Sequence, residues 1–325
     1  MEDSLFPRDT LAARHIAESA KPYSGDPALQ DVLDWFRAQP NLEARFGQVI
    51  RQSIDEVLDG QRTGRFDIDE LEKTEKTYLG TKVEIVTRSE FGLGHGQRMD
   101  YHIVGHDVDS KFTSGGNWTI PREADGHICL LTKANDHKAH YQVGLLRIRD
   151  EFLNAGKNRD GKRSISAAGR GAIHWIVENG QITQNILLSL PEVERTAIFN
   201  ASAGYRGSGN GGQLRTNELF RRVQGKPVNR NTVLTVASQD DGPKRVRDAR
   251  NHLRPEGIMI LGHQSQHPRI ARDLGLSVAE KGSWVAVRVA HADSSDATRK
   301  KTRISGQEYV AWRAGDTPVA APESY

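Results

Sequence analysis

Apolar positions recur at helical spacing in three segments of the N-terminal half. In residues 26–60 the recurring side chains are Leu29, Val32, Leu33 and Phe36, followed by Phe46, Val49, Ile50, Ile54 and Val57. Side chains three or four positions apart share one face of a helix, so the segment predicts two amphipathic helices, separated at Pro40 and ended at Gly60. A third helix is predicted over residues 69–91, with Glu84 at the edge of its apolar face.

Shorter apolar runs after the third helix are typical of strands. The stretch "DYHIVGHDVDSKF", Asp100 to Phe112, alternates around Gly105 and His106 as two short strands with a tight turn. The runs "GHICLLT" and "HYQVGLLRIRDEFL" predict buried strands, the second leading into a helix. Helices followed by strands and then by further helices favour an α/β (α+β) unit with a mixed sheet.

The chain divides into two parts of different character. A polar, glycine-containing stretch before "NILLSLP" predicts a first domain over residues 1–175, a linker over 176–184 and a second domain over 185–325. Residues 1–184 carry 24 basic and 28 acidic side chains, net −4, and residues 185–325 carry 21 and 14, net +7, which sum to +3. A basic second part indicates an anionic partner such as nucleic acid, and the carboxylates of the first could hold a metal.

Two observations narrow the class of protein. No stretch approaches the roughly 20 apolar residues of a membrane helix, and the start "MEDSLFPRDTLAARH" lacks the features of a signal peptide. We therefore expect a soluble, cytoplasmic protein without a membrane partner. The single cysteine, Cys129, excludes an intrachain disulfide and a cysteine-built zinc site, and its apolar neighbours predict a buried, inert thiol.

The predicted hairpin sets opposite charges on one strand face. Asp109 and Lys111 are two positions apart, about 7 Å along the strand, while Asp100 begins the paired strand and Glu84 lies on the helix upstream. Carboxylate oxygens suit Mg²⁺, and an ammonium beside them can stabilise or orient groups in phosphodiester cleavage. Asp-x-Lys occurs twice more in the chain, however, and the same pattern is compatible with a surface hairpin whose ion pair faces water.

A second signal lies in residues 216–263, which alternate helix, turn, helix, turn, helix and strand. The third helix has an apolar side and a basic side, on which we expect four cations to project outward: Lys244, Arg245, Arg247 and Arg250. This is the order of a helix-turn-helix unit followed by a wing, in which such cations meet phosphates and guanine edges in the major groove. The alternative is a helical bundle with a solvated basic face.

The turn "DGQRTGR", Asp59 to Arg65, offers two further cations. Arg62 and Arg65 precede the helix of Glu84 and are candidates for contact with the DNA backbone near the cleavage site. A solvated turn is the alternative interpretation.

These segments resemble the NaeI restriction endonuclease family over most of the chain. The resemblance is carried by "DGQRTGRFDIDELEKTEKTYLGTKVEI", "DYHIVGHDVDSKF", "GHICL", "TNELFRRVQGKPVNR" and "LRPEGIMILGH". It implies a nuclease domain of the PD-(D/E)xK kind and a mainly helical, winged helix-turn-helix domain similar to that of the catabolite activator protein. It also implies that the metal-binding acids fall on Glu84, Asp100 and Asp109, and the catalytic lysine on Lys111.

The sequence therefore predicts a Mg²⁺-dependent type II restriction endonuclease that leaves a 5′-phosphate and a 3′-hydroxyl. The resemblance implies a GC-rich palindrome, GCCGGC, as its site on double-stranded DNA, and a second, effector DNA bound by the C-terminal domains. A palindrome requires two equivalent protomers, so a homodimer is expected. Two alternatives stay open: a winged-helix regulator without catalysis, and a DNA repair nuclease on the same fold.

Overall fold

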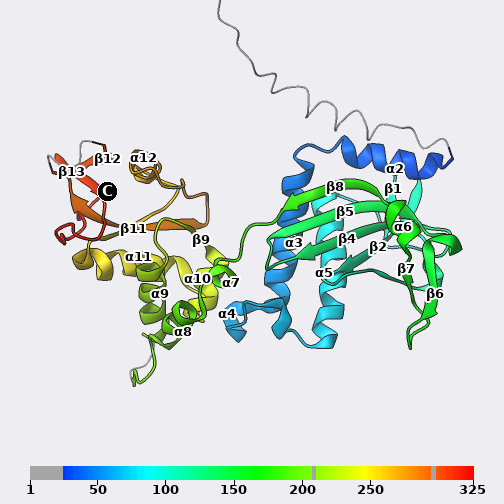
Figure 1. The fold of residues 1–325 in the computed structure, drawn as a ribbon, viewed down its shortest axis with the longest axis horizontal. Helices are drawn as coiled ribbons and strands as arrows, with labels where there is room; N and C mark the ends of the chain where they lie inside the picture. The colour runs from blue at the N-terminus through cyan, green and yellow to red at the C-terminus, as the bar shows by residue number, and fades with distance from the viewer. Residues whose placement is uncertain (1–24, 207–209, 294–297) are drawn as a thin grey trace, which may run out of the picture. The chain divides into compact units, whose positions relative to one another are not determined.

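The computed structural model describes residues 25–206, 210–293 and 298–325, and Figure 1 shows its elements. The first 24 residues of the predicted first domain lie outside the described residues. The chain forms two compact units, each of which draws on separate stretches of sequence. The first unit combines the residues up to Ile50 with Gly80–Asn135 and His140–Ile182, and the second combines Arg51–Leu79, Asp136–Ala139 and Thr183–Tyr325.

A five-stranded mixed sheet forms the centre of the first unit. Its order is β1-β2-β4-β5-β8, with β2 and β4 parallel and the other neighbours antiparallel, so the predicted mixed sheet is confirmed. The predicted hairpin is also confirmed, because β1 and β2 are joined by Val104 and Gly105, with φ angles of 43° and 89° as in a tight hairpin turn. The strands are β1 (Tyr101–Ile103), β2 (His106–Thr113), β4 (Ile128–Asn135), β5 (His140–Arg147) and β8 (His174–Gln181).

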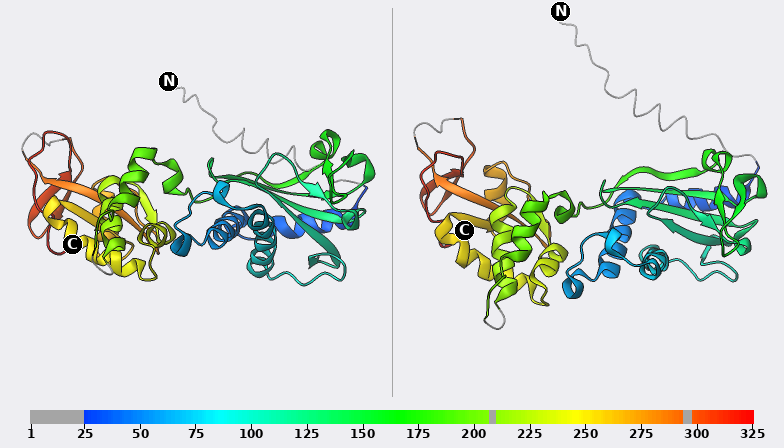
Figure 2. Two further views of the ribbon diagram at one scale, coloured as in Figure 1. Left: turned by 90° about the horizontal axis from the view of Figure 1, so that it is seen from below. Right: turned by 60° about the horizontal axis from the view of Figure 1, so that its bottom comes forward.

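The three helices that apolar spacing predicts lie on one face of this sheet, as the turned views in Figure 2 show. They are α2 (Pro27–Arg37), α3 (Leu42–Leu58) and α5 (Lys73–Phe91). The rings of Phe36, Phe46 and Phe91, one from each helix, pack with centroids 4.7–5.8 Å apart. This aromatic cluster joins the helices into one layer. The third helix begins later than predicted, because the separate turn η1 (Ile68–Glu70) precedes it.

A smaller sheet of order β3-β7-β6 packs on the opposite face. Trp118 and Ile165 of this region contact Cys129 and Leu131 of β4 in one apolar cluster. The indole Nε1 of Trp118 also donates to the carbonyl oxygen of Thr132 at 2.9 Å. The elements here are β3 (Thr119–Ile120), η2 (Arg122–Ala124), η3 (Asp150–Phe152), β6 (Leu153–Lys157), β7 (Arg163–Ile165) and α6 (Ala167–Gly171).

Two local predictions were wrong. The run after β5 does not continue into a helix: one short turn, η3, leads into strand β6, where Asn154 and Gly156 have low helical propensity. The predicted linker over 176–184 contains the second half of β8. The polar residues of β8 are tolerated because it is an edge strand with one face exposed. Gly180 allows it to cross Tyr141, whose ring would lie 2.3 Å from any added Cβ.

The second unit begins with helices and ends with strands. The predicted order of three helices and a strand is present as α9, α10, α11 and β10, with β9 between the first two helices. The sheet has the order β10-β11-β13-β12, and β9 also pairs with β11. In the described part of the chain, no helix is long and apolar enough to cross a membrane. The elements are α4 (Gly60–Thr63), α7 (Ile186–Ser189), α8 (Glu192–Asn200), α9 (Gly211–Arg222), β9 (Pro227–Asn229), α10 (Arg230–Ala237), α11 (Gly242–Leu253), η4 (Arg254–Glu256), β10 (Ile258–Leu261), α12 (His267–Asp273), β11 (Ser283–His291), β12 (Lys301–Ile304) and β13 (Gln307–Ala311).

A buried charge network ties the end of α3 into the second unit. The guanidinium of Arg51 lies 2.6 Å from a carboxylate oxygen of Asp55 and 2.6 Å from one of Asp136. The amide Nδ2 of Asn231, on α10, donates to the other oxygen of Asp55 at 2.6 Å. The side chain of Asp136 is fully buried and that of Arg51 nearly so. One arginine therefore pairs with two carboxylates, of which one is fully buried and the other mostly buried.

Replacing Arg51 by methionine is expected to destabilise the protein by about 3–5 kcal/mol, because two buried carboxylates lose their cation. The measurement is the midpoint of urea unfolding followed by tryptophan fluorescence. Arg62→Met is the matched control, since the Arg62–Asp59 pair is exposed and worth at most about 1 kcal/mol. Equal midpoints for the two variants would contradict a structural role for the network.

Candidate active site

Strand β2 presents Asp109 and Lys111 on the same face. Asp109 lies opposite Cys129 of the parallel strand β4, so both charged side chains point to the side of the sheet that the smaller sheet covers. Ser110 between them points to the helices, with its hydroxyl 3.1 Å from the phenol oxygen of Tyr101. The ammonium Nζ of Lys111 lies 2.5 Å from Oδ2 of Asp109. The buried carboxylate thus has a cation beside it.

Asp100 lies at an open edge of β2. Strand β1 begins at Tyr101, opposite Val108, so beyond this point no described strand pairs with that edge. The backbone N–H of Ser110 instead donates to Oδ2 of Asp100 at 2.7 Å. The ammonium of Lys111 donates to the Ser110 carbonyl oxygen at 3.0 Å. Asp100, the Asp109–Lys111 pair and the Ser110 carbonyl oxygen therefore lie along the edge of β2 beside the start of β1.

Glu84 reaches the same region from helix α5. Arg88, one helical turn later, donates to Oε1 of Glu84 at 2.5 Å and to the carbonyl oxygen of Asp100 at 3.2 Å. The phenol of Tyr101 donates to the backbone carbonyl of Glu84 at 3.1 Å. These contacts fasten the helix to the start of the hairpin, so the position of Glu84 relative to Asp100 is set by hydrogen bonds.

Burial and mutual repulsion shape the electrostatics of the cluster. Burial raises the pKa of Glu84, and the charge of Asp100 adds to the effect. Burial likewise raises the pKa of Asp109. Burial alone would lower the pKa of Lys111, but the adjacent Asp109 carboxylate outweighs it, so the pKa is raised and the ammonium stays charged. Carboxylates in such surroundings are stabilised by an added cation.

The structure brings the four predicted catalytic residues into one region without closing them into a compact ligand set. Among the described residues, the acids Glu84, Asp100 and Asp109 do not place their oxygens within 4.8 Å of one another. Each acid is instead held by its own partner: Arg88, the Ser110 N–H or Lys111. The described group that does meet this distance is the partly exposed set Asp67, Asp69 and His137.

Four residues in contact with the predicted site were missed from the sequence. Arg88 carried a detectable signal, because it follows Glu84 by four positions on a helix, the spacing of a side-chain pair. The thiol of Cys129 donates to Oδ2 of Asp109 at 3.4 Å, and burial raises its pKa well above the usual range, so the group is neutral. The other two are Tyr101 and Ser110. Their roles depend on strand register, which local sequence does not reveal.

The four cations predicted on the third helix of the second unit, α11, separate into two kinds. Lys244 and Arg247 are exposed. Arg245 bonds through Nε to Asp241 at 3.2 Å and is mostly buried. Arg250 donates from Nε to the carbonyl oxygen of Ile260 at 2.9 Å. The expectation that all four project outward was therefore wrong for Arg245, which pairs with the residue just before its own helix, and for Arg250, which holds the helix to β10.

The two cations of the turn before η1 also differ. Arg62 is 74% exposed and lies 3.1 Å from Asp59. Arg65 forms two hydrogen bonds with the carboxylate of Glu75, at 2.8 and 2.9 Å. A bidentate pair fixes the guanidinium, so Arg65 orders this turn against the start of α5, and Arg62 is the cation presented to solvent.

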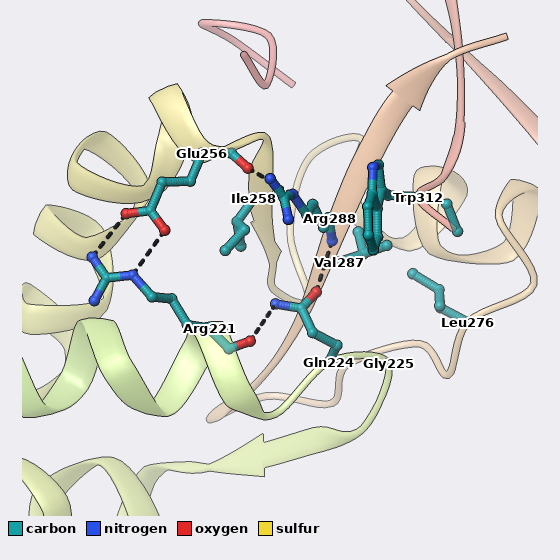
Figure 3. A pocket seen from close by; sticks show the side chains of 10 residues that line it. Arg221, Gln224, Gly225, Glu256, Ile258, Leu276, Val287, Arg288 and Trp312 are labelled. Carbon is teal, nitrogen blue, oxygen red and sulfur yellow. Dashed lines mark hydrogen bonds and ion pairs between the residues drawn. The ribbon is translucent and has the colours of Figure 1, made fainter. Parts of the chain in front are cut away.

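A cavity of about 580 Å³ in the second unit contains none of the predicted site residues. Figure 3 shows its wall, where Arg221 pairs with Glu256 at 2.8 Å and Arg288 lies over the ring of Trp312. Much of the remaining lining is apolar, with Ile258 among the lining residues. Its charged groups already have partners, which distinguishes this cavity from the cluster on β2.

Comparison with known proteins identifies the family of the chain. The family of restriction endonuclease NaeI matches residues 32–320. The type II restriction enzyme NaeI of Lentzea aerocolonigenes is 45% identical over 283 residues, which cover 86% of this chain and 88% of that protein. Both matches include the β2 cluster and most of the second unit. The chain therefore belongs to the NaeI restriction endonuclease family, enzymes that cut DNA at specific sites.

Proposed function

We propose that the cluster on β2 hydrolyses phosphodiester bonds of double-stranded DNA with the help of Mg²⁺. The observation that carries the proposal is the charged ammonium of Lys111, 2.5 Å from Asp109 and 3.0 Å from the Ser110 carbonyl, at a strand edge bordered by Asp100. A cation beside acids suits a reaction in which a phosphate gains negative charge. This assigns the nuclease core to the PD-(D/E)xK class, in the domain of residues 1–175.

The donor set suits a hard divalent cation. Asp100 and Asp109, helped by Glu84, offer carboxylate oxygens from three elements, and the described site contains no competing sulfur ligand other than a neutral thiol. Mg²⁺ prefers oxygen ligands and keeps several waters, so a loosely gathered set is sufficient. When bound, the ion polarises the scissile phosphate and lowers the pKa of a bound water.

The residues of the chain supply position and charge. Lys111 remains protonated, and we assign it to the attacking water or to a non-bridging phosphate oxygen, within reach of its ammonium. Attack of the water oxygen on phosphorus breaks the bond to O3′ and leaves a 5′-phosphate and a 3′-hydroxyl. Asp109 keeps the ammonium in place, and Arg88 keeps Glu84 beside Asp100.

We infer that residues 185–325, the predicted second domain, form a winged-helix DNA-binding domain. Support comes from the order α9, β9, α10, α11, β10, β11 and from the pairing of β9 and β10 with β11. On this assignment α11 is the recognition helix. Lys244 and Arg247 are the two cations of this helix that are free to meet DNA. Arg62 is the matching candidate near the nuclease core.

The family assignment supports a finer proposal for the biological reaction. We propose that two protomers form a dimer in the cytoplasm and cut the palindrome GCCGGC. A second DNA bound at the C-terminal domains would act as effector. A palindrome presents two equivalent half-sites and two strands, which a symmetric dimer matches with two active sites.

Lys111→Ala is expected to lower the cleavage rate at least about 100-fold, because it removes the positioned cation. Binding should be kept. The assay incubates intact plasmid with protein and Mg²⁺ and sequences the product ends, which also maps the site. Lys138→Ala is the matched control, since it alters another Asp-x-Lys triplet of the chain. Binding without cleavage by both the wild type and Lys111→Ala would favour a DNA-binding regulator.

Arg88→Lys is expected to reduce cleavage by about 10- to 100-fold and to raise the Mg²⁺ concentration needed for half-maximal rate. A lysine keeps the charge but does not form the fork between Glu84 and the Asp100 carbonyl. Arg45→Lys is the control on the same layer, because Arg45 also donates to a carboxylate and a carbonyl oxygen, both of Glu90, which is not a predicted site residue. A cleavage rate and Mg²⁺ dependence equal to those of the control would exclude a positioning role for Arg88.

A further inference from the structure

The hairpin of β6 and β7 has an edge strand with unusual exposure. β6 is the outer strand of the smaller sheet, and its residues Asn154, Ala155, Gly156 and Lys157 are all exposed. The first three side chains are small or absent, and a Cβ added to Gly156 would meet no atom within 4 Å. Exposed edge strands are usually blunted because their free N–H and C=O groups attract other chains. The guanidinium of Arg163 bonds to the carbonyl oxygens of Leu153 and Asn154, so the backbone left open to close approach is that of Ala155 and Gly156.

Cations surround this strand at the turn. Lys157, Arg159 and Lys162 have no carboxylate within 4.0 Å among the described residues, whereas Arg163 pairs with Asp150 at 2.5 Å and so holds the base of the hairpin. The turn itself is ordered by Asn158. Its side-chain oxygen accepts hydrogen bonds from the N–H groups of Asp160 and Lys162, at 3.0 and 2.9 Å. The three free cations therefore project from a turn of defined shape.

The hairpin is fastened to the strand that carries the candidate catalytic lysine. The hydroxyl of Thr113, which ends β2, donates to the carbonyl of Asn117 at 3.1 Å. The side chain of Asn117 then donates to the carbonyl of Ile165, in β7, at 2.8 Å. Ile165 also packs in the apolar cluster with Cys129, the neighbour of Asp109. The smaller sheet thus lies on the face of the main sheet to which Asp109 and Lys111 point.

We propose that the β6–β7 hairpin inserts into the major groove of the substrate DNA and contacts base edges, with Arg159 and its neighbouring lysines on the flanking phosphates. The major groove admits a two-stranded ribbon. Small side chains on the outer strand let its backbone approach the bases, and a merely solvated basic turn would not need them. The inference rests on the proposed function and adds the element by which the nuclease unit recognises sequence.

Two substitutions separate groove insertion from simple charge attraction. Gly156→Val keeps the charge and adds bulk in open space, so the fold should tolerate it while close approach is blocked. Arg159→Ala removes one cation. Both are made in the full chain carrying Lys111→Ala, so that binding is measured without cutting. The control is Arg37→Ala, an exposed cation on α2, in the helical layer on the other face of the sheet.

Binding is measured to a duplex with the site mapped from the wild-type plasmid digest and to the same duplex with one base pair of the site exchanged. We expect Gly156→Val to weaken binding to the mapped site at least about tenfold, with little change for the altered duplex. Arg159→Ala should weaken binding to both duplexes and lower the slope of log affinity against log salt by about 1. Arg37→Ala should change neither the affinity for the two duplexes nor its salt dependence. The circular dichroism spectra of all variants should be the same.

The other outcomes overturn the proposal. If Gly156→Val binds both duplexes as the parent does, groove insertion is wrong, whether or not Arg159→Ala weakens both through phosphates. In that case cleavage by the wild type still supports the proposed function. If the wild type cuts no DNA, the proposed function fails and the role of the hairpin fails with it.

Discussion

The ion pair between Asp109 and Lys111 is the interaction on which the candidate site depends. Both groups lie on an inner strand of a mixed sheet, beside a fully buried thiol. An unpaired charge at such a position is strongly unfavourable, so each group is tolerated because the other is present. Beyond Val108 the edge of β2 next to this pair has no partner strand among the described residues. Beside the start of β1, the Lys111 ammonium donates to the Ser110 carbonyl oxygen at the open edge of β2.

The surrounding layers follow from this placement. Glu84 is supplied by a helix that packs on the opposite face, so the site is assembled around the edge of the sheet, and Arg88 bridges the two sides. The smaller sheet packs against Cys129 and continues directly from the end of β2. Strand β2 thus positions both the candidate catalytic residues and the β6–β7 hairpin. A shift of β2 by one residue would exchange these faces and bury Ser110 in place of Asp109.

The features that the sequence predicted correctly are those set by local periodicity. Leu29, Val32 and Phe36 define a helix face wherever the helix packs, and Gly105 permits a positive φ in the tight turn, which lies at Val104 and Gly105, one residue earlier than predicted. Features decided by distant partners were missed. The polar strand β8 exists because β5 offers it an edge. Arg65 and Arg250 turn toward partners that proximity in the fold supplies, whereas Asp241, the partner of Arg245, lies only four positions earlier in the sequence. Asp100 was predicted because it precedes a strand, but its bond to the Ser110 N–H depends on where β1 begins.

The basic character of the second unit is therefore an incomplete guide to DNA contact. Several of its arginines neutralise carboxylates of the same unit, as Arg221 does with Glu256 and Arg222 with Glu194. A cation already bound at less than 3 Å gives up that partner before it meets a phosphate, which lowers its net contribution to binding. The cations that matter most are those without such partners. In the described chain these include Lys244 and Arg247 on α11 and the tip of the β6–β7 hairpin, which belong to different units. Sequence-specific cutting requires both kinds of contact, because phosphate contacts position a duplex and base contacts select it.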